Sequence, residues 1–169
     1  MSALLKIIPE LCIGCRSCEL ACSLENENIM AASGSRINVI SFIESRAYGM
    51  PYHLPVTCYQ CADAPCVNVC PEGALNRDQD VVHLDMDKCT VCGQCIKACP
   101  FGLIRHDKVL KKIVKCELCD GSPACVEICP SGAILFEASE PFHARKKTFE
   151  TLAYRALKKN TNIADNQSL

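Results

Sequence analysis

The chain has 169 residues, and its 18 basic and 19 acidic side chains give a net charge of −1, which excludes a nucleic acid or an anionic membrane as a partner held by charge. No apolar run approaches the length of a membrane-spanning helix, so no membrane span is expected. Hydrophobic residues reach 49% of the chain only when its 16 cysteines are counted, which leaves a modest apolar core, and we expect metal centres to help hold the fold.

The cysteines fall into four runs of four, with none left over. The runs are Cys12, Cys15, Cys18 and Cys22; Cys58, Cys61, Cys66 and Cys70; Cys89, Cys92, Cys95 and Cys99; and Cys116, Cys119, Cys125 and Cys129. The third run reads C-x2-C-x2-C-x3-C-P, the spacing with which bacterial ferredoxins bind [4Fe–4S] clusters. At four thiolates for each cluster, the 16 cysteines predict four clusters and a protein that transfers electrons.

Two other uses of the cysteines fit less well. Disulfides are typical of secreted chains, but residues 1–10 show no basic segment, long apolar run or twin arginine of an export signal. Sixteen free thiolates indicate a reducing compartment instead, and the cytoplasm of an anaerobic microbe is expected. A structural zinc usually takes two cysteine pairs separated by about a dozen residues or more, whereas each run here is complete within 11 to 14 residues.

The first run is followed by different structure from the others. No proline follows Cys22, so a helix is predicted to continue through Glu25 to about Met30. Residues 36–40 then predict a strand, and Met50-Pro51 and Leu54-Pro55 predict loop.

The other three runs are each followed by the same phrase of proline, any residue, glycine and two apolar residues, at positions 71–75, 100–104 and 130–134. The proline is expected to end a short helix that carries the fourth cysteine, and the glycine to turn the chain with a positive φ. Strands are predicted at residues 81–84 and 134–136. The short separation of Cys70 and Cys89 makes it easy for the second and third runs to share one module, and it leaves the first and fourth runs as the remaining partners without requiring that they pair.

Two stretches resemble a known family. Residues 55–75 read PVTCYQCADAPCVNVCPEGAL and residues 116–130 read CELCDGSPACVEICP. They are similar to the second and fourth motifs of the four-cluster electron-transfer subunits that accompany dimethyl sulfoxide reductase, formate dehydrogenase, hydrogenases and tungsten aldehyde oxidoreductases. The resemblance covers residues 3–138. It implies an α+β fold of two ferredoxin-like modules, one built from residues 1–35 and 105–140 and the other from residues 36–104.

The resemblance also implies which cysteines share a cluster, because in the family the fourth cysteine of each run joins the partner run. The implied sets are Cys12, Cys15, Cys18 and Cys129; Cys116, Cys119, Cys125 and Cys22; Cys58, Cys61, Cys66 and Cys99; and Cys89, Cys92, Cys95 and Cys70. Family members with a three-iron centre have lost a cysteine of the third run, but here Cys92 and its neighbours are present, so four [4Fe–4S] clusters are expected. The short segment between Cys119 and Cys125 indicates the short, soluble branch of the family.

Basic and histidine side chains outside the runs are expected to be surface or packing residues. The basic group is Arg105, Lys108, Lys111, Lys112 and Lys115, and the histidines are His53, His83, His106 and His143. A solvated hairpin is the favoured interpretation of the basic group, and a docking patch for an acidic partner is the alternative.

The end of the chain, residues 141–169, predicts a helical tail. Apolar residues of segment 148–159 recur at helical spacing, at Phe149, Leu152, Ala153, Ala156 and Leu157. This helix is expected either to pack on its own module or to bind a catalytic subunit or another copy of the chain. Residues 161–169 are expected to be a disordered end.

The sequence therefore predicts an electron-transfer subunit that has no catalytic residues and is not itself an enzyme. It would relay electrons through four [4Fe–4S] clusters between a catalytic oxidoreductase subunit and an acceptor, a flavin subunit or a ferredoxin. A tungsten or molybdenum enzyme acting on aldehydes or formate is the first expectation for the catalytic subunit, and a nickel hydrogenase is the next. A free, diffusible polyferredoxin and an iron–sulfur protein for metalloenzyme maturation are the alternatives.

Overall fold

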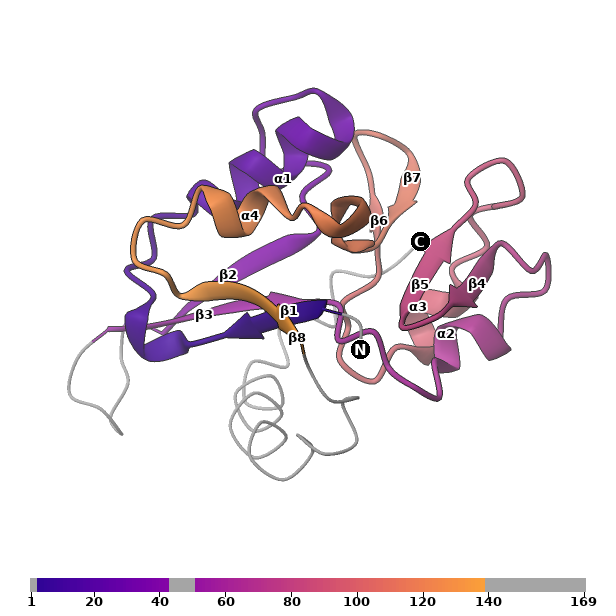
Figure 1. Cartoon of the computed structure of the whole chain (residues 1–169). Helices are drawn as coiled ribbons and strands as arrows, with labels where there is room; N and C mark the ends of the chain where they lie inside the picture. Colours follow the sequence, from indigo (N-terminus) through magenta and orange to yellow (C-terminus); the bar gives the residue numbers. More distant parts are fainter. Residues whose placement is uncertain (1–2, 43–50, 139–169) are drawn as a thin grey trace.

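The structure is a computed structural model that describes residues 3–42 and 51–138 (Figure 1). The strands in this part of the chain form four separate antiparallel pairs with short helices beside them, which is an α+β architecture. The strand pairs are β1 (Ala3–Ile7) with β8 (Ile134–Ala138), β2 (Ile37–Phe42) with β3 (Tyr52–Thr57), β4 (Leu75–Asp78) with β5 (Val81–Leu84), and β6 (Arg105–Asp107) with β7 (Lys112–Val114). The helices are α1 (Ser17–Glu27), α2 (Pro65–Asn68), α3 (Gln94–Ala98) and α4 (Ala124–Glu127), with 3-10 turns η1 (Pro9–Leu11) and η2 (Leu118–Gly121).

The first and last strands are neighbours although they come from opposite ends of the described chain. β1 pairs with β8 from Ala3 opposite Ala138 to Ile7 opposite Ile134. The pairing extends beyond the strands, because the N–H of Ile8 donates to the carbonyl of Ala133 at 2.8 Å. This pairing brings the first and fourth cysteine runs together, and α1 and α4 lie in contact on one side of the strand pair (Figure 1).

A first core fills the space between these two helices and the strands. It consists of Cys18, Cys22, Ile37, Val39, Cys125 and Ile134. Ile37 and Val39 of β2 are buried and Asn38 between them is exposed, because successive side chains of a strand point to opposite faces.

A second core lies around α2, α3 and the β4–β5 pair. It consists of Ala64, Cys66, Leu75, Val82, Cys95, Ile104 and Ile113. Ile37 and Val39 thus pack with the first and fourth runs, although the predicted boundaries place them in the module of the second and third runs. Ile113 packs with the second and third runs, although the boundaries place it in the other module. The division into modules stays a prediction.

The loop predicted at Leu54-Pro55 is wrong, because both residues lie in β3. Pro55 stands opposite Val39 in the ladder. The N–H of Val39 points away from β3 and donates to the buried carboxylate of Glu19 on α1 at 2.6 Å. Val39 and Pro55 therefore form a pair that exchanges no backbone hydrogen bonds, and a proline without an N–H is tolerated there.

Two helix ends also differ from the prediction. α1 ends at Glu27 rather than near Met30, because Asn28 takes a left-handed conformation at φ 55 and its N–H donates to Leu24 at 2.9 Å. The three short helices end before the fourth cysteine of each run and carry the third one instead, namely Cys66, Cys95 and Cys125. The predicted positive φ of the glycine after each proline is confirmed at Gly73, Gly102 and Gly132. The strands predicted at 36–40, 81–84 and 134–136 are confirmed as β2, β5 and β8.

The basic group at residues 105–115 is not a uniformly solvated hairpin, and its use as a docking patch stays a prediction. Arg105 donates to Asn38 at 2.9 Å and to the carbonyl of Ser35, and Lys112 forms an ion pair with Glu27. Lys115 is fully buried, at 1% exposure. Three of the five basic side chains are therefore used inside the fold, leaving Lys108 and Lys111 as its exposed members.

The predicted helix at 148–159 and His143 lie outside the described residues. In the described part of the chain, no helix combines the length and the apolar character that crossing a membrane requires.

Candidate iron–sulfur centres

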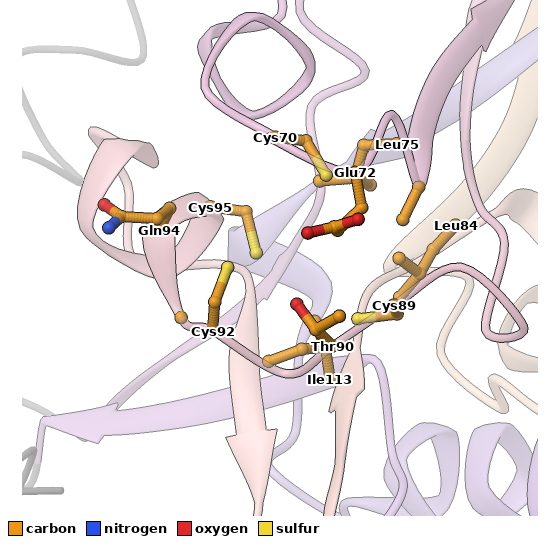
Figure 2. Close-up of a pocket in the computed structure, with 12 residues that line it drawn as sticks. Cys70, Glu72, Leu75, Leu84, Cys89, Thr90, Cys92, Gln94, Cys95 and Ile113 are labelled. Carbon is orange, nitrogen blue, oxygen red and sulfur yellow. The ribbon is translucent and has the colours of Figure 1, made fainter.

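All sixteen cysteines lie in the described residues, and none of them forms a disulfide. Three cavities are each lined by four of them. The first is lined by Cys70, Cys89, Cys92 and Cys95 together with Glu72. Figure 2 shows the sulfur atoms of these four cysteines turned toward a common space, with the Glu72 carboxylate beside it.

The second cavity is lined by Cys58, Cys61, Cys66 and Cys99. Tyr59 also lines it and meets the ring of Phe101 edge-on, with ring centroids 4.8 Å apart. Aromatic and aliphatic side chains thus limit the access of water to this group of cysteines.

The third cavity is lined by Cys22, Cys116, Cys119 and Cys125. Cys22 reaches it from α1, which the β1–β8 pairing has brought against the fourth run. In each of the three cavities, three cysteines belong to one run and one comes from another run.

The remaining four cysteines are near enough to one another to interact electrostatically. They are Cys12, Cys15, Cys18 and Cys129. Burial raises the pKa of the Cys18 thiol to about 12, and charge repulsion from Glu19 and from the other three cysteines adds to the rise. Twelve of the sixteen cysteines thus line three cavities in the combinations that the family resemblance implies. That each group binds a cluster stays a prediction.

Most of the buried thiols are held in an environment that disfavours a bare thiolate. Burial is the main reason that the pKa values of Cys61 and Cys95 rise to about 11, and it also raises the pKa of the Cys125 thiol. Four thiolates brought close together in a largely buried place need a positively charged centre between them. The donor set thus fits an iron–sulfur cluster, which is cationic at its core and takes four cysteine sulfurs.

Hydrogen-bond donors already point at several of the sulfurs. The N–H of Arg36 lies 3.1 Å from Sγ of Cys22, and the N–H of Leu103 lies 3.4 Å from Sγ of Cys99. At Cys129, burial acts to raise the pKa of the thiol, but hydrogen bonds from the Ser131 side chain and the N–H groups of Ile134, Ala133 and Ser131 together lower it. Donors of this kind stabilise negative charge on cluster ligands and shift cluster potentials.

The sequence did not reveal the backbone conformation of the residue that precedes the second cysteine of each run. This residue has a positive φ in all four runs, at Gly14 (70), Gln60 (51), Val91 (57) and Leu118 (63). Only Gly14 carried a signal in the sequence, and there a side chain would also meet the ring of His53, 2.6 Å from an added Cβ. Non-glycine residues in this conformation are strained and persist where the surroundings require them, which is typical of binding loops.

Among the described residues no group of three or more His, Cys, Asp and Glu side chains stands close enough to hold a single metal ion. His53 hydrogen-bonds to Ser41 at 3.0 Å and lies against Gly14, so it has the packing role that was expected.

The cysteine groups and the strand pairs around them define a ferredoxin-like iron–sulfur protein, and the comparisons with known proteins agree. Residues 11–74 and 50–139 each match the 4Fe-4S dicluster domain. The chain is 43% identical over 125 residues to the aliphatic sulfonate oxidoreductase, polyferredoxin-like subunit of Pyrococcus furiosus, covering 73% of this chain and 69% of that one. It is 35% identical over 151 residues to the electron transport protein HydN of Escherichia coli, covering 73% of this chain and 81% of that one.

The chain belongs to the family of ferredoxin-type electron-transfer subunits with 4Fe-4S dicluster domains. Among solved structures, the active site complex BamBC of benzoyl coenzyme A reductase as isolated is similar over 97% of this chain and 95% of that one, with 20% identity and a TM-score of 0.46.

Proposed function

We propose that the chain binds four [4Fe–4S] clusters and serves as the electron-transfer subunit of an oxidoreductase complex. The observation that carries this proposal is the lining of the three cavities, because each takes three cysteines from one run and a fourth from another, as the clusters of two-cluster ferredoxins do. The proposed ligand sets are Cys12, Cys15, Cys18 and Cys129 (site 1); Cys22, Cys116, Cys119 and Cys125 (site 2); Cys58, Cys61, Cys66 and Cys99 (site 3); and Cys70, Cys89, Cys92 and Cys95 (site 4). A bound cluster of this kind accepts and releases one electron at a time.

The chain's own elements would order the four sites in a line. α1 carries ligands of both site 1 and site 2, at Cys18 and Cys22. The second run supplies Cys66 to site 3 and Cys70 to site 4, so these two sites are also neighbours. Sites 2 and 3 would also be neighbours, because Cys116 of site 2 and Cys58 of site 3 interact electrostatically.

The exposed cysteines lie at the two ends of this line. Cys15 of site 1 and Cys92 of site 4 are the exposed members of the set, whereas Cys58 and Cys116, of sites 3 and 2, are half-buried and buried. Electrons would therefore enter from one protein partner at one end and leave to another at the other end.

The partner we propose is a catalytic subunit that oxidises or reduces a small molecule, with tungsten or molybdenum at its active site; a nickel hydrogenase is the next choice. The relative named as a subunit of aliphatic sulfonate oxidoreductase supports an oxidoreductase partner, and the electron transport protein HydN supports the electron-transfer role. A flavin subunit or a ferredoxin would take the electrons on. Sixteen reduced cysteines suit the cytoplasm of an anaerobically growing cell.

The first experiment is an anaerobic purification of the tagged protein from its own cells, with identification of co-purifying proteins and metal analysis. The proposal expects about sixteen irons on the chain and a stoichiometric partner that contains tungsten, molybdenum or nickel. A lone iron-loaded monomer would favour a diffusible polyferredoxin, transfer of the clusters to an apo-enzyme would favour a maturation protein, and a zinc-loaded chain would overturn the proposal.

Paired serine variants test which cysteines share a cluster. Cys12→Ser and Cys129→Ser should alter the same cluster. The double variant should therefore change the electron paramagnetic resonance signal of one cluster and lose no more than about four irons from the chain. Cys12→Ser combined with Cys125→Ser is the matched control and should disturb two clusters. If the Cys12 and Cys129 double variant also disturbs two, each run holds its own cluster and the proposed sets are wrong.

A further inference from the structure

Lys115 is a buried lysine between two of the cysteine groups. Its exposure is 1%, and it is the largest of the fully buried side chains in the described residues. It directly follows β7 and directly precedes Cys116, the first cysteine of the fourth run. A lysine costs a great deal to bury unless its three donors and its charge both find partners.

The donors of Lys115 are satisfied by neutral oxygens. Its Nζ donates to the carbonyl of Val82, to the carbonyl of Cys116 at 2.6 Å and to Oε1 of Gln60 at 3.5 Å. Gln60 is itself buried and donates from Nε2 to the carbonyl of Cys116 at 2.9 Å. Three acceptors around one nitrogen match the three N–H donors of an ammonium group.

The charge of Lys115 has no carboxylate partner among the ion pairs of the described residues, whereas Lys6, Lys88 and Lys112 each pair with an acidic side chain. The groups that its charge reaches are cysteines. Lys115 acts electrostatically on Cys58, Cys66 and Cys116.

These three cysteines belong to two different sites. Cys58 and Cys66 line the cavity of site 3, and Cys116 lines that of site 2. The hydrogen bonds of Lys115 join the same two regions, because Val82 also lines the site 3 cavity and Cys116 belongs to site 2.

We propose that Lys115 is a counter-charge shared by sites 2 and 3 and that it raises the reduction potentials of these two central clusters above the values they would otherwise have. The inference rests on the proposed four-cluster function. A reduced cluster carries one more negative charge than an oxidised one, so a fixed cation in a dry environment favours the reduced form. Electrons would be held preferentially on the central pair, away from the exposed ends.

The test is a redox titration of the complete holoprotein, followed by electron paramagnetic resonance, for the wild type, Lys115→Met and the control Lys112→Met. Methionine keeps most of the side-chain length and removes the charge. Lys112 lies on the preceding strand in a half-buried position, where its charge is paired with Glu27. Its replacement therefore removes the same formal charge from a place outside the two central sites. Iron content is measured on each sample, so that a wild type without four clusters would count against the proposed function and not against the role of Lys115.

In Lys115→Met two of the four clusters should move to lower potential, with about a tenfold fall in the constant for one-electron reduction, which is about 59 mV. The reduction potentials of the other two clusters should change by only a small fraction of that shift. The same holds for all four clusters in Lys112→Met. Unchanged potentials in Lys115→Met, or an equal shift of all four, would overturn the proposal.

Gln60→Glu is the second variant, because it places a carboxylate beside Lys115 while keeping an acceptor for the N–H of Val82, which now donates to Oε1 of Gln60 at 3.0 Å. It should lower the potentials of the same two clusters, and it decides the question if Lys115→Met fails to hold its iron. Failure of both variants to bind four clusters would assign Lys115 to folding and would also overturn the proposal.

Discussion

Asp107 is a buried carboxylate that ties the segment after α1 to the β6–β7 turn, and its loss should destabilise the protein measurably. Its oxygens accept from Ser33 Oγ at 2.8 Å, from the N–H of Gly34 at 2.6 Å, and from the N–H groups of Val109 and Leu110 at 2.9 and 3.0 Å. The link joins residues that are more than seventy positions apart in the sequence.

The size of the effect follows from the pKa of Asp107. Burial acts to raise that pKa, but the hydrogen bonds from Leu110, Gly34, Ser33 and Val109 outweigh it and lower the pKa from 3.8 to about 2. A difference of about two pKa units between the unfolded and folded chain corresponds to roughly 2 to 3 kcal/mol of stability at neutral pH. Because the folded pKa is the lower one, this stability is complete above about pH 4 and is lost as the pH falls toward about 2.

Asp107→Asn should therefore lower the free energy of unfolding of the holoprotein by about 2 to 3 kcal/mol. The reason is that the amide group brings an N–H donor to a place where four donors already converge. The assay is the anaerobic loss of the iron–sulfur absorbance in a guanidinium series, with Asp78→Asn on the exposed end of β4 as the matched control. The difference between Asp107→Asn and the wild type should be the same at pH 7 and pH 5.5, because both lie above the titration range. A variant that behaves like the control, or a difference that shrinks between these two pH values, would refute the reasoning.

Three further predictions concern the cluster sites and the tail. Removal of all iron by an anaerobic chelator should leave the chain largely unstructured, because cysteines form much of both cores, and well-dispersed amide resonances in the iron-free sample would contradict this. Glu72→Gln should raise the potential of one cluster, that of site 4, because it removes a negative charge from the lining of that cavity; a redox titration with no shift, or with a shift at another cluster, would speak against it. Deleting residues 141–169 should reduce the size of the assembly if that tail joins copies or subunits, and an unchanged size in light scattering would remove the tail as a connector.

The amino-acid sequence by itself determined the features that depend on near neighbours in the chain. The spacing of Cys89, Cys92, Cys95 and Cys99 predicts its iron–sulfur chemistry because a few residues of loop can bring three sulfurs around one centre. The turns at Gly73, Gly102 and Gly132 and the strands β5 and β8 were predictable for the same reason, since proline, glycine and apolar alternation act locally.

The tertiary structure decided the features that depend on distant parts of the chain. Pro55 looked like a loop residue because its neighbours in the sequence do not reveal that Glu19 takes the N–H of Val39, which leaves a position in the ladder where no N–H is needed. Lys115 looked like one of five surface charges, but three neutral acceptors and two cysteine groups enclose it. Sequence patterns record the polarity of a side chain, whereas burial and the partners that compensate it arise only when segments far apart in the sequence meet.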